Sequence, residues 1–370
     1  MATALRRYRS SWRDGNRFEL LVDGPTFFPR MLDCVAGATQ AVQLEFYLFE
    51  SGAVADRFID ALTAAAGRGV IVEMLLDDFG ALGLSQRDRA RLVAAGVALA
   101  YYNRLHYSRW LNNLFRDHRK LLLVDGEQAF VGGTGITDAF DPPDPKHPPW
   151  RETMVAVEGP VVRDWQATFA ETWARMTGQE LAVARTPRAL EDGVRGRVTT
   201  ANAEIKRSVI ARTQRARTRV WIATAYFAPS WKLLRALRRA AAHGADVRLL
   251  LPGPLTDHPA VRHAGRRFYG RLLRNRVRIF EYDRRVMHAK TALCDHWVSI
   301  GSSNLDRWNL RWNLEANQEV EDPGFAMQVQ TMFEVDFSES VEWHAASWER
   351  RPWHVRVREY VWGIVARWLT

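Results

Sequence analysis

The sequence predicts an α/β protein made of two copies of one unit. Each unit is expected to be a mixed or mostly parallel sheet flanked by helices, and a pseudo-twofold axis relates the two around one shared site. Three observations lead to this prediction. The same series of strand-like and helix-like segments occurs twice in the same order; the strand-like segments are continuously apolar, as in strands buried on both faces; and a His-x-Lys-x4-Asp pattern occurs once in each half.

The first copy begins with a predicted buried strand at 42–49 (VQLEFYLF) and a helix at 56–69 that ends at a glycine. A strand follows at 70–78, then a helix and a strand within 91–103. The copy closes with the strand HRKLLLVDG at 118–126, which carries the first motif. This alternation of strand and helix is typical of sheets with parallel strands.

The second copy repeats this order, with a strand at 220–227, a helix at 231–244, a strand at 245–253, a helix and a strand within 272–283, and the motif strand at 288–295. We therefore expect a first domain at 1–185 and a second at 186–370. The weakly patterned segment 178–200 is expected to connect them. The proline-rich stretch 141–149 is predicted to be a loop near the site, since proline ends helices and central strands.

Composition points toward an anionic partner. The chain has 52 Lys and Arg against 42 Asp and Glu, a formal charge of +10, which favours a nucleic acid or an anionic membrane surface. An arginine-rich proteome would give the same excess. Only five lysines occur, however, and two of them, Lys120 and Lys290, fall inside the motifs, which indicates a need for a compact ammonium group there.

The two cysteines, Cys34 and Cys294, lie far apart and lack metal-ligand spacing, so we expect buried thiols in a reducing compartment and neither a disulfide nor a zinc site. The N-terminus lacks the apolar core of a signal peptide, and no stretch approaches the roughly 18 apolar residues of a membrane span. A soluble or peripheral protein is expected.

The motifs His118/Lys120/Asp125 and His288/Lys290/Asp295 carry the predicted chemistry. On a strand, residues two apart project from the same face, so imidazole and ammonium converge on one spot. Displacement at phosphorus needs a nucleophile, an acid for the leaving oxygen and positive charge against the non-bridging oxygens. Two copies supply all of these without a metal or another cofactor.

Each motif is followed by a strand that ends in a turn of small residues, FVGGTGI (130–136) and VSIGSSNLD (298–306). Backbone N–H groups in such turns can face an anion. These turns favour the hypothesis that the motifs act on a phosphodiester, because a single His-x-Lys pair without them would more often be an exposed strand end.

At these residues the chain resembles the phospholipase D superfamily and, within it, the bacterial cardiolipin synthases that lack N-terminal transmembrane helices. The resemblance covers nearly the whole chain, with the segments 19–32, 44–52, DHRKLLLVDGEQAFVGG (117–133), WRETMVAVEGPVV (150–162), TAYFAPS (224–230) and 287–320. It implies a phosphatidyltransferase that acts on phosphatidylglycerol, as a cytoplasmic protein peripheral on the inner face of the cell membrane.

The resemblance also implies a covalent phosphohistidine, with His118 as nucleophile and His288 as the acid that later serves as base. Lys120 and Lys290 would hold the phosphoryl oxygens together with Asn304. We further expect Ser302, Gly133 and Thr134 of the two turns to bind substrate. Because the two histidines are coupled, a pH profile will report the pair.

Three further features bear on the site. Glu152 and Glu315 stand where the family carries the carboxylate that orients a histidine; the alternative is a surface acid on a strand. Asp125 and Asp295 either take part directly or pair with neighbours and fix the motif loops. Gly135 stands where the family usually has Asn, which removes a donor that Thr134 or Thr137 could replace. The second motif also has one residue fewer before its glycine turn, so a tighter turn is expected.

The tail at 348–370 interleaves Trp with Arg, which suits the headgroup level of an anionic bilayer and equally suits a helix packed on the core with a basic outer face. The aromatic and basic segment 101–116 is a second candidate for membrane contact or for the site entrance. Its aromatic residues could also be core.

Three alternatives to phosphatidyl transfer stay open. A phospholipase D would use water to resolve the phosphohistidine and release phosphatidic acid. A nuclease of the same superfamily would also suit the positive charge and interleaved aromatics. A catalytically impaired lipid-binding or scaffold protein is suggested by Gly135, although both His-x-Lys pairs are retained. The acceptor lipid and the oligomeric state do not follow from the sequence.

Overall fold

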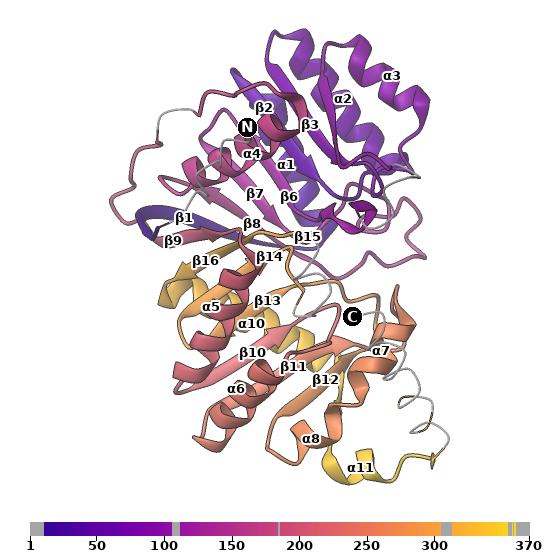
Figure 1. Cartoon of the computed structure of the whole chain (residues 1–370), viewed down its shortest axis with the longest axis vertical. Coiled ribbons are helices and arrows are strands. Elements are labelled where there is room, and N and C mark those ends of the chain that lie inside the picture. The colour runs from indigo at the N-terminus through magenta and orange to yellow at the C-terminus, as the bar shows by residue number, and fades with distance from the viewer. Residues whose placement is uncertain are drawn as a thin grey trace.

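The structure is a computed structural model that describes residues 11–105, 112–183, 186–304 and 313–353, together with Val357 and Glu359. It consists of two α/β units stacked along the long axis, with helices on both faces of one sheet that continues through both units (Figure 1). The predictions for residues 106–111, 184–185 and 305–312, and for most of the tail beyond Trp353, concern residues outside the described ranges.

In its described residues the first unit contains seven strands of the large sheet and four α-helices. The strands are β1 (Arg13–Val22), β2 (Ala41–Phe46), β3 (Ile71–Asp77), β4 (Ala98–Tyr102), β6 (Lys120–Val124), β7 (Gln128–Gly132) and β8 (Thr153–Glu158). The helices are α1 (Gly24–Gly37), α2 (Ala53–Gly67), α3 (Gln86–Ala94) and α4 (Val162–Thr177), and a short 3₁₀ turn spans Asn112–Leu114.

The second unit repeats this series and adds an edge strand. Its strands are β9 (Val194–Thr199), β10 (Arg219–Ala223), β11 (Asp246–Pro252), β12 (Arg278–Tyr282), β13 (Thr291–Cys294), β14 (Trp297–Gly301), β16 (Asn317–Glu321) and β17 (Ser340–Trp343). Its described helices are α5 (Asn202–Arg215), α6 (Trp231–Ala242), α7 (Pro259–Arg266), α8 (Tyr269–Leu273), α10 (Pro323–Ser338) and α11 (Ala345–Glu349).

Strand order confirms the duplication. The large sheet runs β17-β12-β11-β10-β13-β14-β16-β9-β1-β8-β7-β6-β2-β3-β4, so the order on one side of the β9–β1 seam mirrors the order on the other. In each unit the first three strands of the α/β series are parallel, and the remaining strands pair antiparallel. This is the mixed sheet that the sequence predicts.

One hydrophobic cluster joins the two units. It runs from the aromatic side chains of α4 (Trp165, Phe169 and Trp173) across the sheet to those of α10 (Phe325, Phe333 and Phe337). Two further clusters lie under α1 and α2 in the first unit and under α5 and α6 in the second. Because a continuous sheet and a shared core cross the seam, residues of both units are held in fixed positions relative to each other.

The predicted elements are present, with ends that differ by a few residues. The main error is the segment 178–200, predicted as a connection: its last part is strand β9, which pairs with both β1 and β16 at the seam. Strand β9 has the sequence VRGRVT, in which two arginines and a glycine interrupt the apolar pattern that would predict a strand. Gly196 is needed there, because a Cβ atom would lie 2.4 Å from the Cζ of Phe18.

The helices of the described ranges include none with the length and apolar character needed to cross a bilayer.

Candidate active site

The two motifs meet at the boundary between the units. His118 lies between the short strand β5 (Arg116–Asp117) and β6, and Lys120 pairs with Phe46 at the carboxyl end of β2. In the second unit His288 precedes β13, whose first residue Thr291 pairs with Ala223 at the carboxyl end of β10. The carboxyl ends of parallel strands are where α/β sheets place their ligands. Each His thus sits just before its motif strand and not within it.

Each histidine is fixed by a segment of the other unit. The backbone N–H of His288 donates to the carbonyl of Arg151 (2.8 Å), and the N–H of His118 donates to the carbonyl of Leu314 (2.9 Å). In both cases the accepting residue directly precedes one of the two predicted orienting glutamates. A short parallel pairing of β5 with β15 (Asn313–Leu314) holds the second of these contacts in place.

The glutamates complete the exchange. Oε2 of Glu152 lies 2.6 Å from Nδ1 of His288, and Oε2 of Glu315 lies 3.2 Å from Nδ1 of His118. Both glutamates are fully buried, so neither is the surface acid that the sequence left open. With Nδ1 engaged in both rings, Nε2 is the nitrogen that can react with a substrate, and in His288 it also lies 3.3 Å from Nζ of Lys290.

Burial and positive charge favour neutral imidazoles. Burial, with the charges of Lys120 and Lys290, holds the pKa of His118 well below its usual value. Burial and Lys290 also lower the pKa of His288, but the hydrogen bond and negative charge of Glu152 oppose that shift. His288 is therefore the better proton carrier of the two and His118 the better neutral nucleophile.

The two lysines lie beside their histidines. Each Nζ donates to the carbonyl of the histidine two residues before it, and Nζ of Lys290 also lies 3.6 Å from Oε2 of Glu152. Burial lowers the pKa of Lys120 to about 7 and also lowers that of Lys290. The residue between His118 and Lys120 points to the opposite face, as predicted, where Arg119 pairs with Glu45.

The two glutamates differ in charge. Burial alone would raise the pKa of Glu152, yet the charge of Lys290 and the bond with His288 outweigh it and the pKa is lowered. Burial raises the pKa of Glu315 to about 8, and the charge of Lys120 offsets only part of this. At neutral pH the duplicated site is thus asymmetric, with an ionised acid beside His288 and a largely protonated one beside His118.

Asp125 and Asp295 lie in the hairpin turns at the far ends of the motif strands. Asp125 accepts from the backbone N–H groups of Thr39, Gln40 and Ala41, and Asp295 accepts from those of Arg217, Thr218 and Arg219. These contacts join each hairpin to the start of the neighbouring strand. They support the structural alternative and correct the inclusion of both residues in a catalytic group.

Two of the predicted substrate-binding residues serve Glu152 and Glu315. The N–H of Gly133 donates to the carbonyl of Thr153, and a Cβ at Gly133 would lie 2.3 Å from Oε2 of Glu152. The hydroxyl of Ser302 donates to Oε2 of Glu315 (2.5 Å), and its N–H donates to the carbonyl of Ala316. In the structure one residue makes room for its acid and the other orients it, and their binding of substrate stays a prediction.

Asn304 and the threonines differ in what they offer. Asn304 is fully buried, and within the described part of the chain neither polar atom of its side chain has a hydrogen-bond partner, as expected of a group kept for a ligand. The hydroxyls of Thr134 and Thr137 donate to the carbonyl of Gly135 and to Glu50. Neither is a ready replacement for the donor lost at Gly135.

Gly135 has a packing reason. A Cβ atom there would lie 2.8 Å from the Cβ of Leu48, closer than such atoms approach. The tighter second turn is confirmed, since Cys294 pairs with Trp297 across two residues whereas Val124 pairs with Gln128 across three.

Several site residues were missed by the sequence reasoning. The ring of Tyr47 lies 4.9 Å from that of His118, and the rings of Trp150, Phe140 and Tyr226 lie 5.6, 5.7 and 6.3 Å from that of His288. The proline-rich loop thus ends at the site, as predicted.

Asp257 is the other missed residue. Its carboxylate accepts from the hydroxyl of Tyr226, and His288 and Lys290 help to lower its pKa against the effect of burial. The sequence offered two pointers to this part of the site, the segment TAYFAPS (224–230) and the loop that follows 245–253. Neither places a carboxylate beside a histidine.

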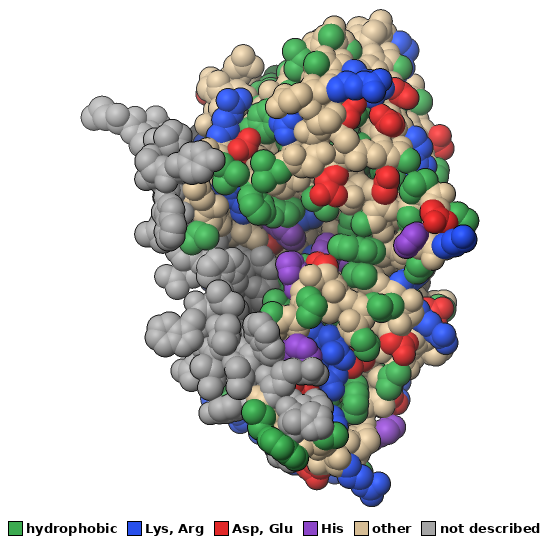
Figure 2. All heavy atoms as spheres, turned by 90° about the vertical axis from the view of Figure 1, so that its right-hand side faces the viewer, with side chains coloured by type: hydrophobic (Ala, Val, Ile, Leu, Met, Phe, Trp, Pro, Cys, Tyr) green, Lys and Arg blue, Asp and Glu red, His purple; other side chains and the backbone are tan. Residues whose placement is uncertain are grey.

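The surface view shows where this site opens. Histidine side chains gather in a hollow about midway along the long axis, between the two units, with hydrophobic side chains around it (Figure 2). His118 and His288 are each 8% exposed, so a substrate must reach into the hollow to meet them. The described residues contain no group of three or more His, Cys, Asp and Glu side chains placed to hold a metal ion.

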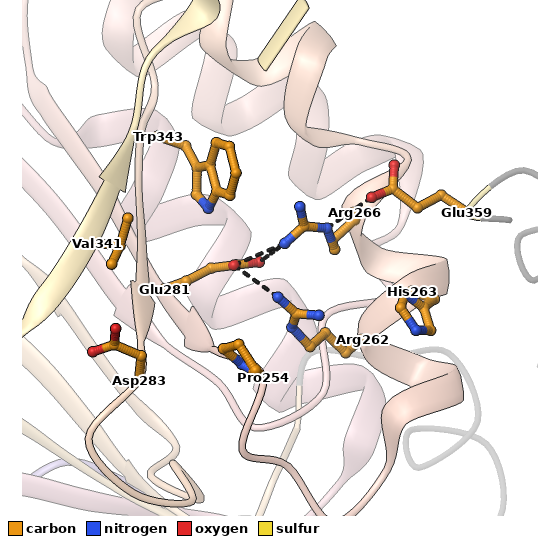
Figure 3. Close-up of a pocket in the computed structure, with 9 residues that line it drawn as sticks. All are labelled: Pro254, Arg262, His263, Arg266, Glu281, Asp283, Val341, Trp343 and Glu359. Atoms are coloured by element: carbon orange, nitrogen blue, oxygen red, sulfur yellow. Dashed lines mark hydrogen bonds and ion pairs between the residues drawn. The ribbon is translucent and has the colours of Figure 1, made fainter. Parts of the chain in front are cut away.

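A second hollow of about 310 Å³ lies beside α7 and the end of β12 (Figure 3). Glu281 pairs there with Arg262 and Arg266, and Arg266 also pairs with Glu359 of the C-terminal segment (2.8 Å). Glu359 also pairs with Arg351, so these ion pairs hold Glu359 beside α7. Trp348 is buried and Trp353 is 75% exposed, which gives the start of the tail both a packed side and an exposed one.

The sequence of the chain is similar to those of known proteins. The family model described as "Cardiolipin synthase, PLD-like domain" matches residues 31–173 and 209–337. The chain is 36% identical over 334 residues to cardiolipin synthase B of Escherichia coli (strain K12), covering 86% of this chain and 79% of that protein. It is 33% identical over 347 residues to cardiolipin synthase A of Pseudomonas aeruginosa (strain LESB58), covering 91% and 70%.

Solved structures share the fold. The phosphatidylserine synthase of Haemophilus influenzae Rd KW20 superposes with a TM-score of 0.70 at 14% identity, covering 95% of this chain and 93% of that one. The polyphosphate kinase of Porphyromonas gingivalis superposes with a TM-score of 0.60 at 15% identity, covering 96% and 54%. At these identities the likeness concerns the fold alone.

Proposed function

The chain belongs to the family of PLD-like cardiolipin synthases, and from that premise we propose that it joins two phosphatidylglycerol molecules into cardiolipin through a phosphohistidine. Its activity is phosphatidyl transfer, and phospholipids are its substrates. The observation that carries the mechanism is the exchange of glutamates between the two motifs, which places an ionised acid beside one imidazole and a largely protonated acid beside the other.

In the first step, Nε2 of His118 attacks the phosphorus of the donor lipid. The bond from phosphorus to the glycerol headgroup oxygen breaks, and His288 gives its proton to that oxygen. Phosphatidyl stays on His118. Lys120, Lys290 and Asn304 face the charge that develops on the non-bridging oxygens.

In the second step, the acceptor hydroxyl of another phosphatidylglycerol loses its proton to His288 and attacks the phosphohistidine. The P–N bond breaks, cardiolipin leaves, and His288 is protonated as at the start. Water in place of the alcohol would release phosphatidic acid, so the outcome depends on which hydroxyl is present at this moment.

Electrostatics support these roles. A nucleophile must be neutral, and His118 has the more strongly lowered pKa. An acid must gain and keep a proton while the donor binds, and the ionised Glu152 at 2.6 Å stabilises the imidazolium of His288. The negative charge of Asp257 acts in the same direction.

The test is incubation of the purified chain with phosphatidylglycerol vesicles and EDTA, followed by separation of the lipids. Cardiolipin with an equal amount of glycerol supports the proposal. Phosphatidic acid alone would assign hydrolysis instead, and cleavage of single-stranded DNA with no lipid turnover would assign a nuclease and contradict the lipid reading.

A further inference from the structure

Exposed apolar side chains gather at the loops that surround His118. Four of the seven exposed large hydrophobic residues in the described part of the first unit lie there: Phe79 and Leu82 after β3, Leu105 after β4, and Phe115 before β5. Their exposed fractions run from 39% to 63%. Single exposed apolar residues need no explanation, but a group of them around a site opening does.

The loop that carries Phe79 and Leu82 is built onto the nucleophile. Asp77 accepts from the N–H groups of Phe79 and Gly80 with one oxygen and from the N–H of Asp117, next to His118, with the other. Gly80 lies against Tyr47, where a Cβ would be 2.0 Å from the carbonyl oxygen. Since the ring of Tyr47 contacts His118, the loop and the histidine form one rigid assembly.

Leu105 and Phe115 are joined to the same assembly. The N–H of Leu105 donates to Asp78 (2.9 Å), and the side chain of Asn103 donates to the carbonyl of Phe115 (2.7 Å). Arg116 reaches back to the carbonyl of Asn103. Hydrogen bonds therefore hold three separate loops at fixed positions on one side of the site.

The second unit offers a counterpart. Leu255 is 49% exposed in the loop after β11, the strand equivalent to β3 in the duplicated order. That loop also carries Asp257, whose partner Tyr226 contacts His288. We name Phe79, Leu82, Leu105, Phe115 and Leu255 the apolar rim. Figure 2 shows hydrophobic side chains around the hollow in which the histidines gather.

We infer that the apolar rim inserts into the surface of a phospholipid bilayer and so places the site over its lipid substrates. The inference rests on the proposed function, because it is the lipid substrate that selects a bilayer as the occupant. A phosphatidyl group has two acyl chains that stay in the bilayer while its phosphorus must reach histidines that are 8% exposed. Apolar side chains at the rim of the site insert into the bilayer surface, and this brings the histidines close enough to reach the phosphorus.

The net positive charge of the whole chain agrees with an anionic lipid surface, while the charges beside the rim balance one another. Arg104 is exposed next to Leu105, and Arg284 is exposed in the loop that leads to His288, while Asp78 and Asp283 are the acids on these two segments. The formal charge of the chain is +10. Attraction of the whole molecule and insertion of the rim act together, as for other interfacial proteins.

The experiment compares two double variants of the full chain. Phe79→Ser with Leu82→Ser removes two rim side chains. Ile71→Ser with Val93→Ser removes two side chains whose exposure, 62% and 58%, is similar to that of Phe79 and Leu82, at 51% and 63%. These two residues lie toward the ends of the strands that are opposite the site. All four positions are at the surface, so both proteins are expected to fold, which thermal unfolding checks.

Binding to phosphatidylglycerol vesicles is measured by sedimentation in high salt, where apolar insertion dominates. The rim variant is expected to lose affinity by about 10-fold or more, given the apolar area that two such side chains bury, and the control variant to change less than about twofold. Turnover of a short-chain phosphatidylglycerol below its micellar concentration should be the same for both variants.

Equal vesicle binding by the two variants would overturn the inference. A rim variant that binds vesicles normally but loses self-association would also overturn it, since the rim would then be a contact between copies of the chain. Vesicle binding is measured without turnover. An absence of lipid turnover would therefore contradict the proposed function and leave the binding result standing by itself.

Discussion

Oε2 of Glu152 lies 2.6 Å from Nδ1 of His288, although the two residues belong to different copies of the duplicated unit. Glu315 and His118 make the reciprocal contact at 3.2 Å. Each unit therefore supplies the histidine of one pair and the carboxylate of the other. The active site depends on both copies being held at the seam, and the ionised Glu152 beside His288 breaks the symmetry.

The first prediction follows from this difference in charge. Glu152→Gln removes the ionised acceptor of His288 and is expected to lower kcat on the order of 10²–10⁴-fold. Glu315→Gln should cost less than about 10-fold, because Glu315, with its pKa of about 8, is already largely protonated at neutral pH. Initial rates of cardiolipin formation check this, and equal losses in both variants would contradict the assigned asymmetry.

The second prediction concerns the covalent intermediate. His118→Ala is expected to abolish the phosphoenzyme formed from a donor lipid with labelled phosphorus, because it removes the attacking nitrogen. His288→Ala keeps that nitrogen but lacks the base for the second step, so labelled enzyme should form slowly and persist. Acid-labile label is measured after denaturation. Label that persists in His118→Ala would reverse the two roles.

The sequence predicted the duplication and the motif strands, because each leaves a local pattern of apolar runs or of spaced residues, whereas the family resemblance indicated both glutamates. The pairing of each glutamate with a histidine leaves no such pattern. Nothing in WRET or NLEAN indicates that Glu152 contacts the histidine of the other copy. Strand β9 was missed because charged residues interrupt its apolar pattern at the seam. The backbone contacts of Gly133 and Ser302, to Thr153 and Ala316, were not predicted because they depend on the folded sheet.

The third prediction is a loss of kcat/KM as pH rises above about 7. Burial lowers the pKa of Lys120 to about 7, so the free enzyme loses this positive charge with rising pH while His118 is already neutral. Lys120→Met should be slower by about 10²–10³-fold and lose the part of the alkaline decline that Lys120 causes, whereas Lys120→Arg should keep its charge and move that part to higher pH. A wild-type profile that is flat from pH 7 to 9 would contradict this.

The same pKa shifts set the pH dependence of stability. The lowered pKa of His118 means that the unfolded chain binds more protons below pH 6.5, so the contribution of His118 to stability is complete above that pH and falls as pH decreases. The raised pKa of Glu315 acts in the opposite sense, with stability lost between its unfolded value of 4.5 and about 8 as pH rises.

The fourth prediction concerns Asp257, which helps to keep a proton on His288. Asp257→Asn is expected to lower kcat about 10-fold and to shift the alkaline limb that His288 sets in the pH profile to lower pH, because the imidazolium needed in the first step loses a stabilising charge. Tyr226→Phe keeps the carboxylate and is the control, with a smaller shift of that limb. A profile that moves equally in both variants would assign Asp257 to loop structure alone.

The fifth prediction restores the family residue at Gly135. A donor at this position would be expected to help the phosphate, yet a Cβ there would lie 2.8 Å from the Cβ of Leu48, so we expect Gly135→Asn to lower the free energy of unfolding by about 1–3 kcal/mol. Leu48→Gly combined with Gly135→Asn removes the Cβ atom of this contact, and the double variant should be more stable than the sum of the two single changes predicts. Urea unfolding of the four proteins measures the coupling. Strict additivity would show that the overlap with Leu48 is not the reason that glycine occupies this turn.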